Sequence, residues 1–398
     1  MAGRDSARAR TRWGIVTLAV SAGFVAAMQV GKVPPALPGL RAELDIGLVA
    51  GGWVASLFAI TSAALGLLAG IAGDRIGARR AMQLALVLIA CGSLAGGLAD
   101  GLWPLLAARL VESVGFVGVA VAAPALIVAA TTPDDRRLAV GLWSTYLPVG
   151  FALMLLLAEP ILSGFGWRAL WHLNAGVVLI FLIAFHFGTR GLTAAGFGLD
   201  RRWHQIRQTL ARSGLWLLAL CFLLYSLQWF AVMTWLPTFL FEVEGRSGEA
   251  ITALVALVVL VNAGGNLAGT WLLQRGAPRW SLIALSAVAT ALIGGGIYSG
   301  LTPGPSKLWL AFAYSLISGV TPAAALTGAV FHAPSPAHVG ASNGIIVQGA
   351  QAGSLLGPPI LAFVVAGQGW QQAPWLFAIA SAGSLALALL LRRAERRL

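Results

Sequence analysis

Hydrophobic residues gather in long runs along this chain, and short polar segments separate the runs. A helix needs about 20 apolar residues to cross the hydrocarbon core of a bilayer. The pattern predicts twelve such spans, at residues 13–33, 47–70, 81–99, 102–130, 138–163, 169–188, 214–240, 250–273, 280–300, 307–331, 341–366 and 372–391. Backbone that faces lipid must be helical or part of a closed barrel. We therefore expect an all-α membrane protein with twelve transmembrane helices.

Composition points to the same class of protein. Of the 398 residues, 58% are hydrophobic and only 10% are charged, whereas soluble domains carry about 25% charged residues. The 49 glycines suit helices that pack closely in a membrane. The net charge of +12 comes from short basic clusters between apolar runs, not from one continuous basic face, which argues against nucleic-acid binding.

The basic clusters also predict how the chain crosses the membrane. Cytoplasmic segments of multi-pass proteins are rich in Lys and Arg. The clusters at 4–12, 75–80, 136–137, 190–212 and 392–397 fall on one side of a chain with twelve spans. We expect a multi-pass protein of the inner membrane with both termini in the cytoplasm.

The longest polar interval divides the chain into two halves. It follows the sixth predicted span and contains the basic stretch DRRWHQIRQTLARSG. Transporters that are built from parallel repeats have this layout. The prediction is a six-helix bundle over residues 1–188, a cytoplasmic linker over 189–213, and a second, pseudo-symmetric six-helix bundle over 214–398.

The loop between the second and third predicted spans carries a specific motif. Its defining positions follow the spacing G-x-x-x-D-R-x-G-x-[RK]-[RK] and are Gly70, Asp74, Arg75, Gly77, Arg79 and Arg80. Glycines permit a tight turn and close helix approach, and the aspartate can pair with the arginines. The loop resembles the signature of the major facilitator superfamily. The resemblance extends along nearly the whole chain and implies an alternating-access transporter whose cytoplasmic gate this loop latches.

Other segments indicate a branch of that family. The fifth span lacks the pattern G-x-x-x-G-P-x-x-G-G of drug/proton antiporters, which disfavours multidrug antiport. The run Gly-Leu-Trp-Ser-Thr at 141–145 and Gly-Trp-Arg at 166–168 resemble the cyanate and nitroimidazole transporter branch. Arg109 resembles the buried arginine of the family motif R-x-x-Q-G, in which Glu112 here replaces the glutamine.

Four charged residues stand out as candidates inside the apolar spans, all in the first half: Lys32, Arg109, Glu112 and Glu159. A charge that faces lipid costs about 2.5 kcal/mol or more, so such residues usually face a cavity or a partner. Arg109 and Glu112 are three residues apart and share a helix face. They could couple proton movement to conformational change, or they could form a static pair that orders the fourth span.

Lys32 and Glu159 lie near the outer ends of their spans. Lys32 could contact an anionic substrate, as a cation near this position does in organic-anion carriers that the chain resembles, or it could extend to the membrane surface. The family fold would bring Glu159 within reach of Lys32. The two could then form an outer gate, and the alternative is an isolated carboxylate at a helix end.

Polar residues within the spans of the second half are uncharged. The candidates are Gln228, Trp229, Asn262, Asn266 and Gln348. Asn262 and Asn266 share a helix face because they are four residues apart. These side chains could bind a substrate, or they could simply join helices by hydrogen bonds.

Motifs that are typical of enzymes and of metal or nucleotide binding are missing from the sequence. No phosphate-binding loop, metal-ligand spacing or nucleophile with its base occurs, so we expect no enzyme, cofactor or metal. We expect a monomeric secondary transporter in the lipid bilayer that moves a small anionic or zwitterionic metabolite, with a proton as coupling ion. Export of a neutral or lipophilic compound is the main alternative, and a transporter-like receptor that moves nothing is another.

Overall fold

The computed structural model describes residues 11–64, 77–190, 207–245, 249–335 and 338–396. Within these ranges the chain forms helices and no strand, as the hydrophobic runs predict. In the first half the helices are α1 (Trp13–Gly31), α2 (Val33–Leu44), α3 (Leu48–Ser56), η1 (Leu57–Ala59), α5 (Ala78–Gly97), α6 (Leu102–Ala130), α7 (Pro133–Ser144) and α8 (Tyr146–Gly188). We call these helices the first bundle, since α1 and α5 both pack against α6 and α8.

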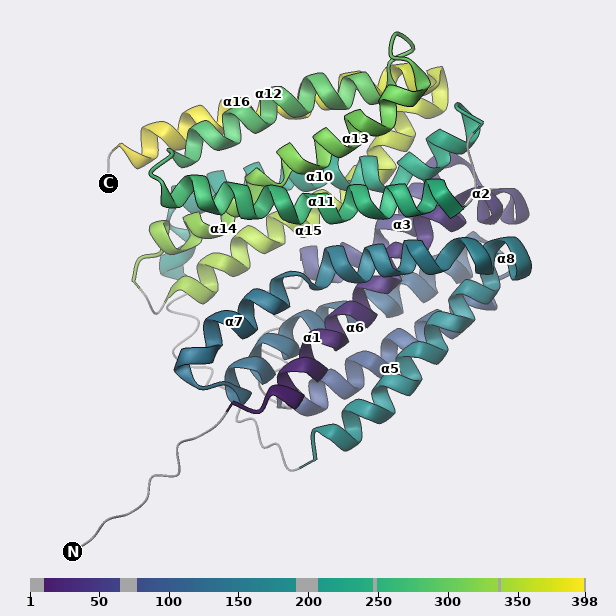
Figure 1. The fold of residues 1–398 in the computed structure, drawn as a ribbon, viewed down its shortest axis with the longest axis horizontal. Helices are drawn as coiled ribbons and strands as arrows, with labels where there is room; N and C mark the ends of the chain where they lie inside the picture. The colour runs from purple at the N-terminus through teal and green to yellow at the C-terminus, as the bar shows by residue number, and fades with distance from the viewer. Residues whose placement is uncertain (1–10, 65–76, 191–206, 246–248, 336–337, 397–398) are drawn as a thin grey trace, which may run out of the picture.

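The second half forms a corresponding group, which we call the second bundle. Its helices are α10 (Ser213–Glu242), α11 (Glu249–Gln274), α12 (Arg279–Tyr298), α13 (Gly304–Ser318), α14 (Val320–His332), α15 (Val339–Gln368), η3 (Trp370–Gln372) and α16 (Ala373–Glu395). Helix α10 packs against α15 and α16, and α12 packs against α13 and α16. Figure 1 shows the two groups one above the other. The exact boundaries expected from the sequence, at 188 and 213, stay a prediction.

Within the described residues, ten helical segments are long and apolar enough to cross a membrane. One of them, α8, has 43 residues and contains the non-helical residue Gly166 (φ 75°, ψ 178°), which separates the predicted spans 138–163 and 169–188. The segment Leu48–Ala64 is shorter, and the rest of the predicted span 47–70 lies outside the described residues. The all-α membrane architecture is confirmed, whereas the count of twelve spans stays a prediction.

Two predicted spans differ from the observed helices in ways that hydropathy does not reveal. The first span, predicted to end at residue 33, continues past Lys32 as α2, because Lys32 keeps helical angles (φ −71°, ψ −27°). Prolines in the first turn of α2 are tolerated there, since the N–H groups of a first turn have no partner within the helix. The predicted span 307–331 is divided at Gly319 into α13 and α14.

The two bundles contact each other through α3 and α15, α8 and α11, and α2 and α10. Gly52 of α3 shows how close this approach is, because a Cβ atom there would lie 2.8 Å from Cα of Pro359. In Figure 1 the start of α1 and the end of α16 lie at one end of the molecule, and α2 lies at the other. We refer to the latter as the α2 end. The cytoplasmic location of both termini stays a prediction.

Candidate functional site

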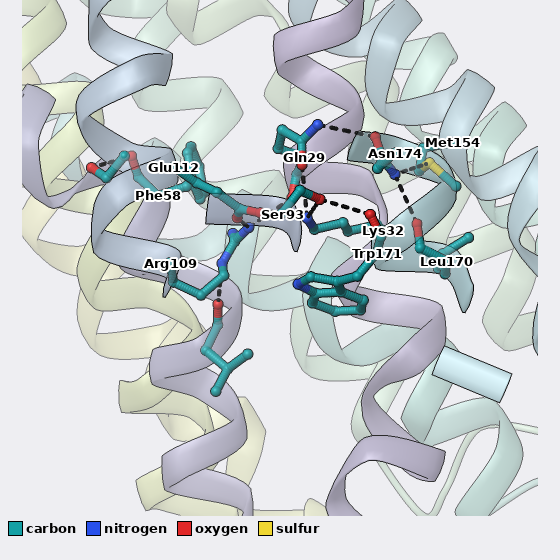
Figure 2. A network of polar contacts seen from close by, with 12 residues as sticks. Gln29, Lys32, Phe58, Ser93, Arg109, Glu112, Met154, Leu170, Trp171 and Asn174 are labelled. Carbon is teal, nitrogen blue, oxygen red and sulfur yellow. Dashed lines mark hydrogen bonds and ion pairs between the residues drawn. The ribbon is translucent and has the colours of Figure 1, made fainter. Parts of the chain in front are cut away.

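Three of the four predicted buried charges meet inside the first bundle (Figure 2). Lys32 lies where α1 joins α2, and Arg109 and Glu112 lie one turn apart on α6. The carboxylate of Glu112 joins the two cations. Its Oε1 is 2.6 Å from Nζ of Lys32, and its Oε2 accepts a hydrogen bond from Nη1 of Arg109. We call these three residues the charge triad.

Arg109 also ties α6 to neighbouring backbone. Its Nε donates to the carbonyl oxygen of Val54 at 2.9 Å, and its Nη1 donates to the carbonyl oxygen of Gln29 at 3.0 Å. Its Nη2 is buried and has no hydrogen-bond partner among the described residues. Arg109 therefore holds three segments together, and both N–H groups of its Nη2 are still without a partner among the described residues.

Polar side chains from two further helices surround Lys32. Its ammonium donates to Oε1 of Gln29 at 2.7 Å and to Oγ of Ser93 at 2.9 Å. Gln29 in turn donates to Oδ1 of Asn174 at 3.0 Å, and the ammonium lies 4.6 Å from the ring centroid of Trp171. The sequence offered one clue to this shell: Gln29 is three residues before Lys32, on the same helix face. Ser93 and Asn174 carry no comparable signal.

The charge triad is sealed from water and not electrically neutral. Lys32 and Arg109 are each 0% exposed and Glu112 is 1% exposed. Two cations and one anion leave one net positive charge, and the described residues contain no second carboxylate paired with either cation. A buried charge without a counter-charge is costly. The site is therefore arranged to accept negative charge.

Glu159 does not belong to this site, so the predicted pair of Lys32 and Glu159 is not formed. Lys32 directs its ammonium at Glu112, Ser93 and Gln29. Glu159 instead accepts a hydrogen bond of 3.4 Å from Thr252 of α11, across the contact between the bundles. Of the two alternatives left open by the sequence, the structure does not form the pair, because Glu112 lies on the face of α6 that meets Lys32.

Two candidates of the second half meet at Ser315 of α13, because Nε1 of Trp229 donates to its Oγ at 3.4 Å and Asn262 donates to its carbonyl oxygen at 2.9 Å. Asn266 donates to Oδ1 of Asn262 at 3.2 Å, so the asparagine pair joins α11 to α13. Gln228 accepts from Ser381 at 3.0 Å.

Trp229 and the remaining candidate, Gln348, lie where the bundles meet. Trp229 packs against Phe151 of the first bundle, with 6.3 Å between ring centroids. Gln348 donates to the carbonyl oxygen of Ala63 at 3.4 Å. Both contacts join the first bundle to the second.

Part of the predicted gate motif can be placed. Gly70, Asp74 and Arg75 lie outside the described residues. Gly77 has a positive φ of 82°, which glycine adopts at little cost. Arg79 donates to Oγ1 of Thr189 at 3.0 Å and to the carbonyl oxygen of His186 at 3.1 Å, so it fastens the start of α5 to the end of α8. Arg80 is exposed.

A sequence profile described as Major Facilitator Superfamily matches residues 19–347. The chain belongs to the Major Facilitator Superfamily. Membership of this superfamily makes the protein a membrane transporter and not an enzyme.

This superfamily member has relatives with different cargo. It is 24% identical over 268 residues to the putative niacin/nicotinamide transporter NiaP of Bacillus subtilis (strain 168), and the match covers 65% of each chain. It is 29% identical over 175 residues to the puromycin resistance protein pur8 of Streptomyces alboniger, which covers 44% of this chain and 35% of that protein. In both matches the chain spans less than two thirds of the length of the relative.

Solved structures share the superfamily fold. A bacterial homolog of the human lysosomal transporter Spinster, inward-facing and occupied, has a TM-score of 0.78 and 17% identity, over 96% of this chain and 95% of that one. The D-xylose-proton symporter has a TM-score of 0.75 and 14% identity, over 95% and 97%. At such identities the likeness shows the fold alone.

Proposed function

We propose that this protein is a secondary transporter that moves a small anionic or zwitterionic metabolite across the inner membrane by alternating access, coupled to protons. The net positive charge of the triad carries the proposal. An anionic group on the substrate would supply the missing counter-charge, and the spare Nη2 donor of Arg109 would bind it. The niacin/nicotinamide relative gives independent support, since niacin is a small carboxylic acid.

Proton coupling would follow from competition for the two cations. In the described structure the carboxylate of Glu112 forms ion pairs with both Lys32 and Arg109. A substrate anion that bound to these cations would weaken their hold on the carboxylate. Glu112 would then be free to take up a proton, so that anion and proton would move together.

Alternating access requires contacts that separate and reform as the bundles rock. At the α2 end the bundles are joined by an ion pair of 2.7 Å between Arg41 of α2 and Glu242 of α10. Thr252 and Glu159 bridge α11 and α8 at the same interface. These contacts are suited to an outer gate, and the loop that carries Gly70, Asp74 and Arg75 would act at the opposite face.

An aromatic interface supports the second candidate, which is export of a neutral or lipophilic compound. Phe58 of η1 meets Phe230 of α10 with 5.7 Å between ring centroids, and Phe151 meets Trp229. These rings are nearly fully buried between the bundles. An uncharged aromatic molecule could replace such ring contacts as the bundles separate. The puromycin resistance relative fits this candidate.

The test is uptake by the purified protein in liposomes under an imposed pH gradient, with nicotinate and nicotinamide as probes. The two share a ring and differ in charge. We expect an acidic exterior to drive nicotinate uptake, and Lys32→Gln to abolish it. Lys307→Gln is the matched control, because Lys307 is another buried lysine that pairs with a carboxylate, Glu244, at 2.6 Å. It should retain uptake.

Other outcomes separate the alternatives. Transport of nicotinamide but not nicotinate would favour the neutral compound. Saturable binding without flux of either probe would favour a receptor. Normal nicotinate uptake by Lys32→Gln would remove the charge triad from substrate binding.

A further inference from the structure

The second bundle has a polar core of its own, and it contains no charge. Helices α10, α12, α13 and α16 surround it, together with the start of α14. Hydroxyl and amide groups line a small cavity there, and they belong to Tyr225, Gln228, Ser286, Thr290, Tyr314, Ser318, Thr321 and Ser384. Inside the first bundle the equivalent place between α1, α5, α6 and α8 holds the charge triad with Ser93 and Asn174.

Two of the lining hydroxyl groups have no partner among the described residues. Tyr314 is 1% exposed and Ser384 is 5% exposed, yet neither hydroxyl makes a hydrogen bond to the described part of the chain. Most neighbouring groups are bonded. Ser286 donates to the carbonyl oxygen of Ile317 at 3.2 Å, and Thr290 donates to that of Ala287 at 3.1 Å. Buried polar groups are nearly always satisfied by protein or by water.

The cavity has the size and chemistry for water. The room that it offers to the centre of a water molecule is about 10 Å³, at the lower limit of about 10–15 Å³ that one molecule needs. A buried water typically makes about three hydrogen bonds. Tyr314 and Ser384 supply two donors. The amide oxygen of Gln228 accepts one bond from Ser381 and has a second lone pair for the water to use.

We propose that this cavity is a binding site for one internal water molecule, which links α13 and α16 to α10. The water accepts hydrogen bonds from Tyr314 and Ser384 and donates one to Gln228. It joins the helices of the second bundle without a charge, where the first bundle uses the ion pairs of Glu112.

Tyr298 provides a matched control for Tyr314. It is also 1% exposed, and its hydroxyl is buried and has no partner among the described residues. It does not line the cavity. If the proposal holds, the hydroxyl of Tyr314 is hydrated and that of Tyr298 is dry.

Microsecond X-ray pulses generate hydroxyl radicals from bound water, and mass spectrometry then reads which buried side chains are oxidised. On the unmodified protein in detergent, we expect Tyr314 to be labelled at least several times faster than Tyr298. Equal labelling rates would overturn the proposal.

A second measurement uses Tyr314→Phe and Tyr298→Phe. The loss of a hydrogen bond to the water should lower the midpoint of thermal unfolding of Tyr314→Phe by about 2–4 °C. Tyr298→Phe should unfold at an unchanged or higher temperature, because it removes an unsatisfied polar group. The proposal fails if both variants shift in the same direction by the same amount.

Discussion

At the scale of single residues, the charge triad predicts that substitutions of its members destabilise the fold to different extents. Glu112→Gln leaves Lys32 and Arg109 buried together without an anion, and breaking a buried pair in this way costs about 3–5 kcal/mol. Lys32→Gln leaves a balanced pair of Arg109 and Glu112, so it should cost much less. We expect the midpoint of thermal unfolding in detergent to fall far more for Glu112→Gln than for Lys32→Gln.

The double variant Lys32→Gln/Glu112→Gln is the control for this prediction. It buries one cation instead of two, so it should be more stable than Glu112→Gln alone. Purely additive losses in the double variant would show that the ammonium and the carboxylate are not coupled, contrary to their separation of 2.6 Å.

The triad also shows what residue-level reasoning can and cannot predict. The cost of a charge in lipid was enough to single out Lys32, Arg109 and Glu112 from the sequence. The partner of Lys32 was not predictable, because pairing depends on how α1 and α6 are rotated and shifted against each other. The sequence could not predict Ser93 and Asn174 as neighbours of Lys32, for a related reason. Serine and asparagine are common where membrane helices meet, and only the packed helices show which of them face Lys32.

At the scale of secondary structure elements, α8 depends on one glycine. Gly166 has φ 75° and ψ 178°, a combination that is essentially restricted to glycine and costs other residues about 1–3 kcal/mol. Gly166→Ala should therefore lower the thermal midpoint. Gly164→Ala is the matched control, since a Cβ atom at either position meets nothing within 4 Å. Gly164 lies in helical backbone, where alanine is favoured over glycine.

The two variants therefore differ in backbone conformation alone, and their stabilities should move in opposite directions. Equal effects would mean that the turn at Gly166 relaxes without strain.

Hydropathy predicted most helices of this chain because a helix that crosses the bilayer needs about 20 apolar residues, and such a run stands out in the sequence. It could not predict breaks that occur within apolar sequence. The division at Gly319 separates α13 from α14 in the middle of such a run. The extension of the first span through Val33 and Pro34 was equally hidden, since prolines usually mark the end of a helix and here begin α2.

At the scale of the whole molecule, the balance between conformations should depend on the ion pair of Arg41 and Glu242, which joins the bundles at the α2 end. Their side chains are 20% and 34% exposed, so the pair is worth only about 0.2–1 kcal/mol. Arg41→Glu replaces this attraction with repulsion. A change of about 1 kcal/mol shifts the population of open and closed forms about fivefold. Charge reversal should therefore favour separation of the bundles at this end.

The distance between spin labels at the α2 end measures this separation. Trp103 of the first bundle is 77% exposed and Leu301 of the second is 95% exposed, so cysteines at both positions can be labelled without disturbing the core. The natural exposed cysteine, Cys91, is first replaced by serine. Arg41→Glu should increase the fraction of molecules with a long distance, and Arg41→Glu/Glu242→Arg should restore the original distribution.

If the double reversal does not restore it, the effect of Arg41 comes from its packing against Gly51 and not from the charge of Glu242. The outer gate would then depend mainly on the tight contact of Gly52 with Pro359, which no change of salt or pH should weaken.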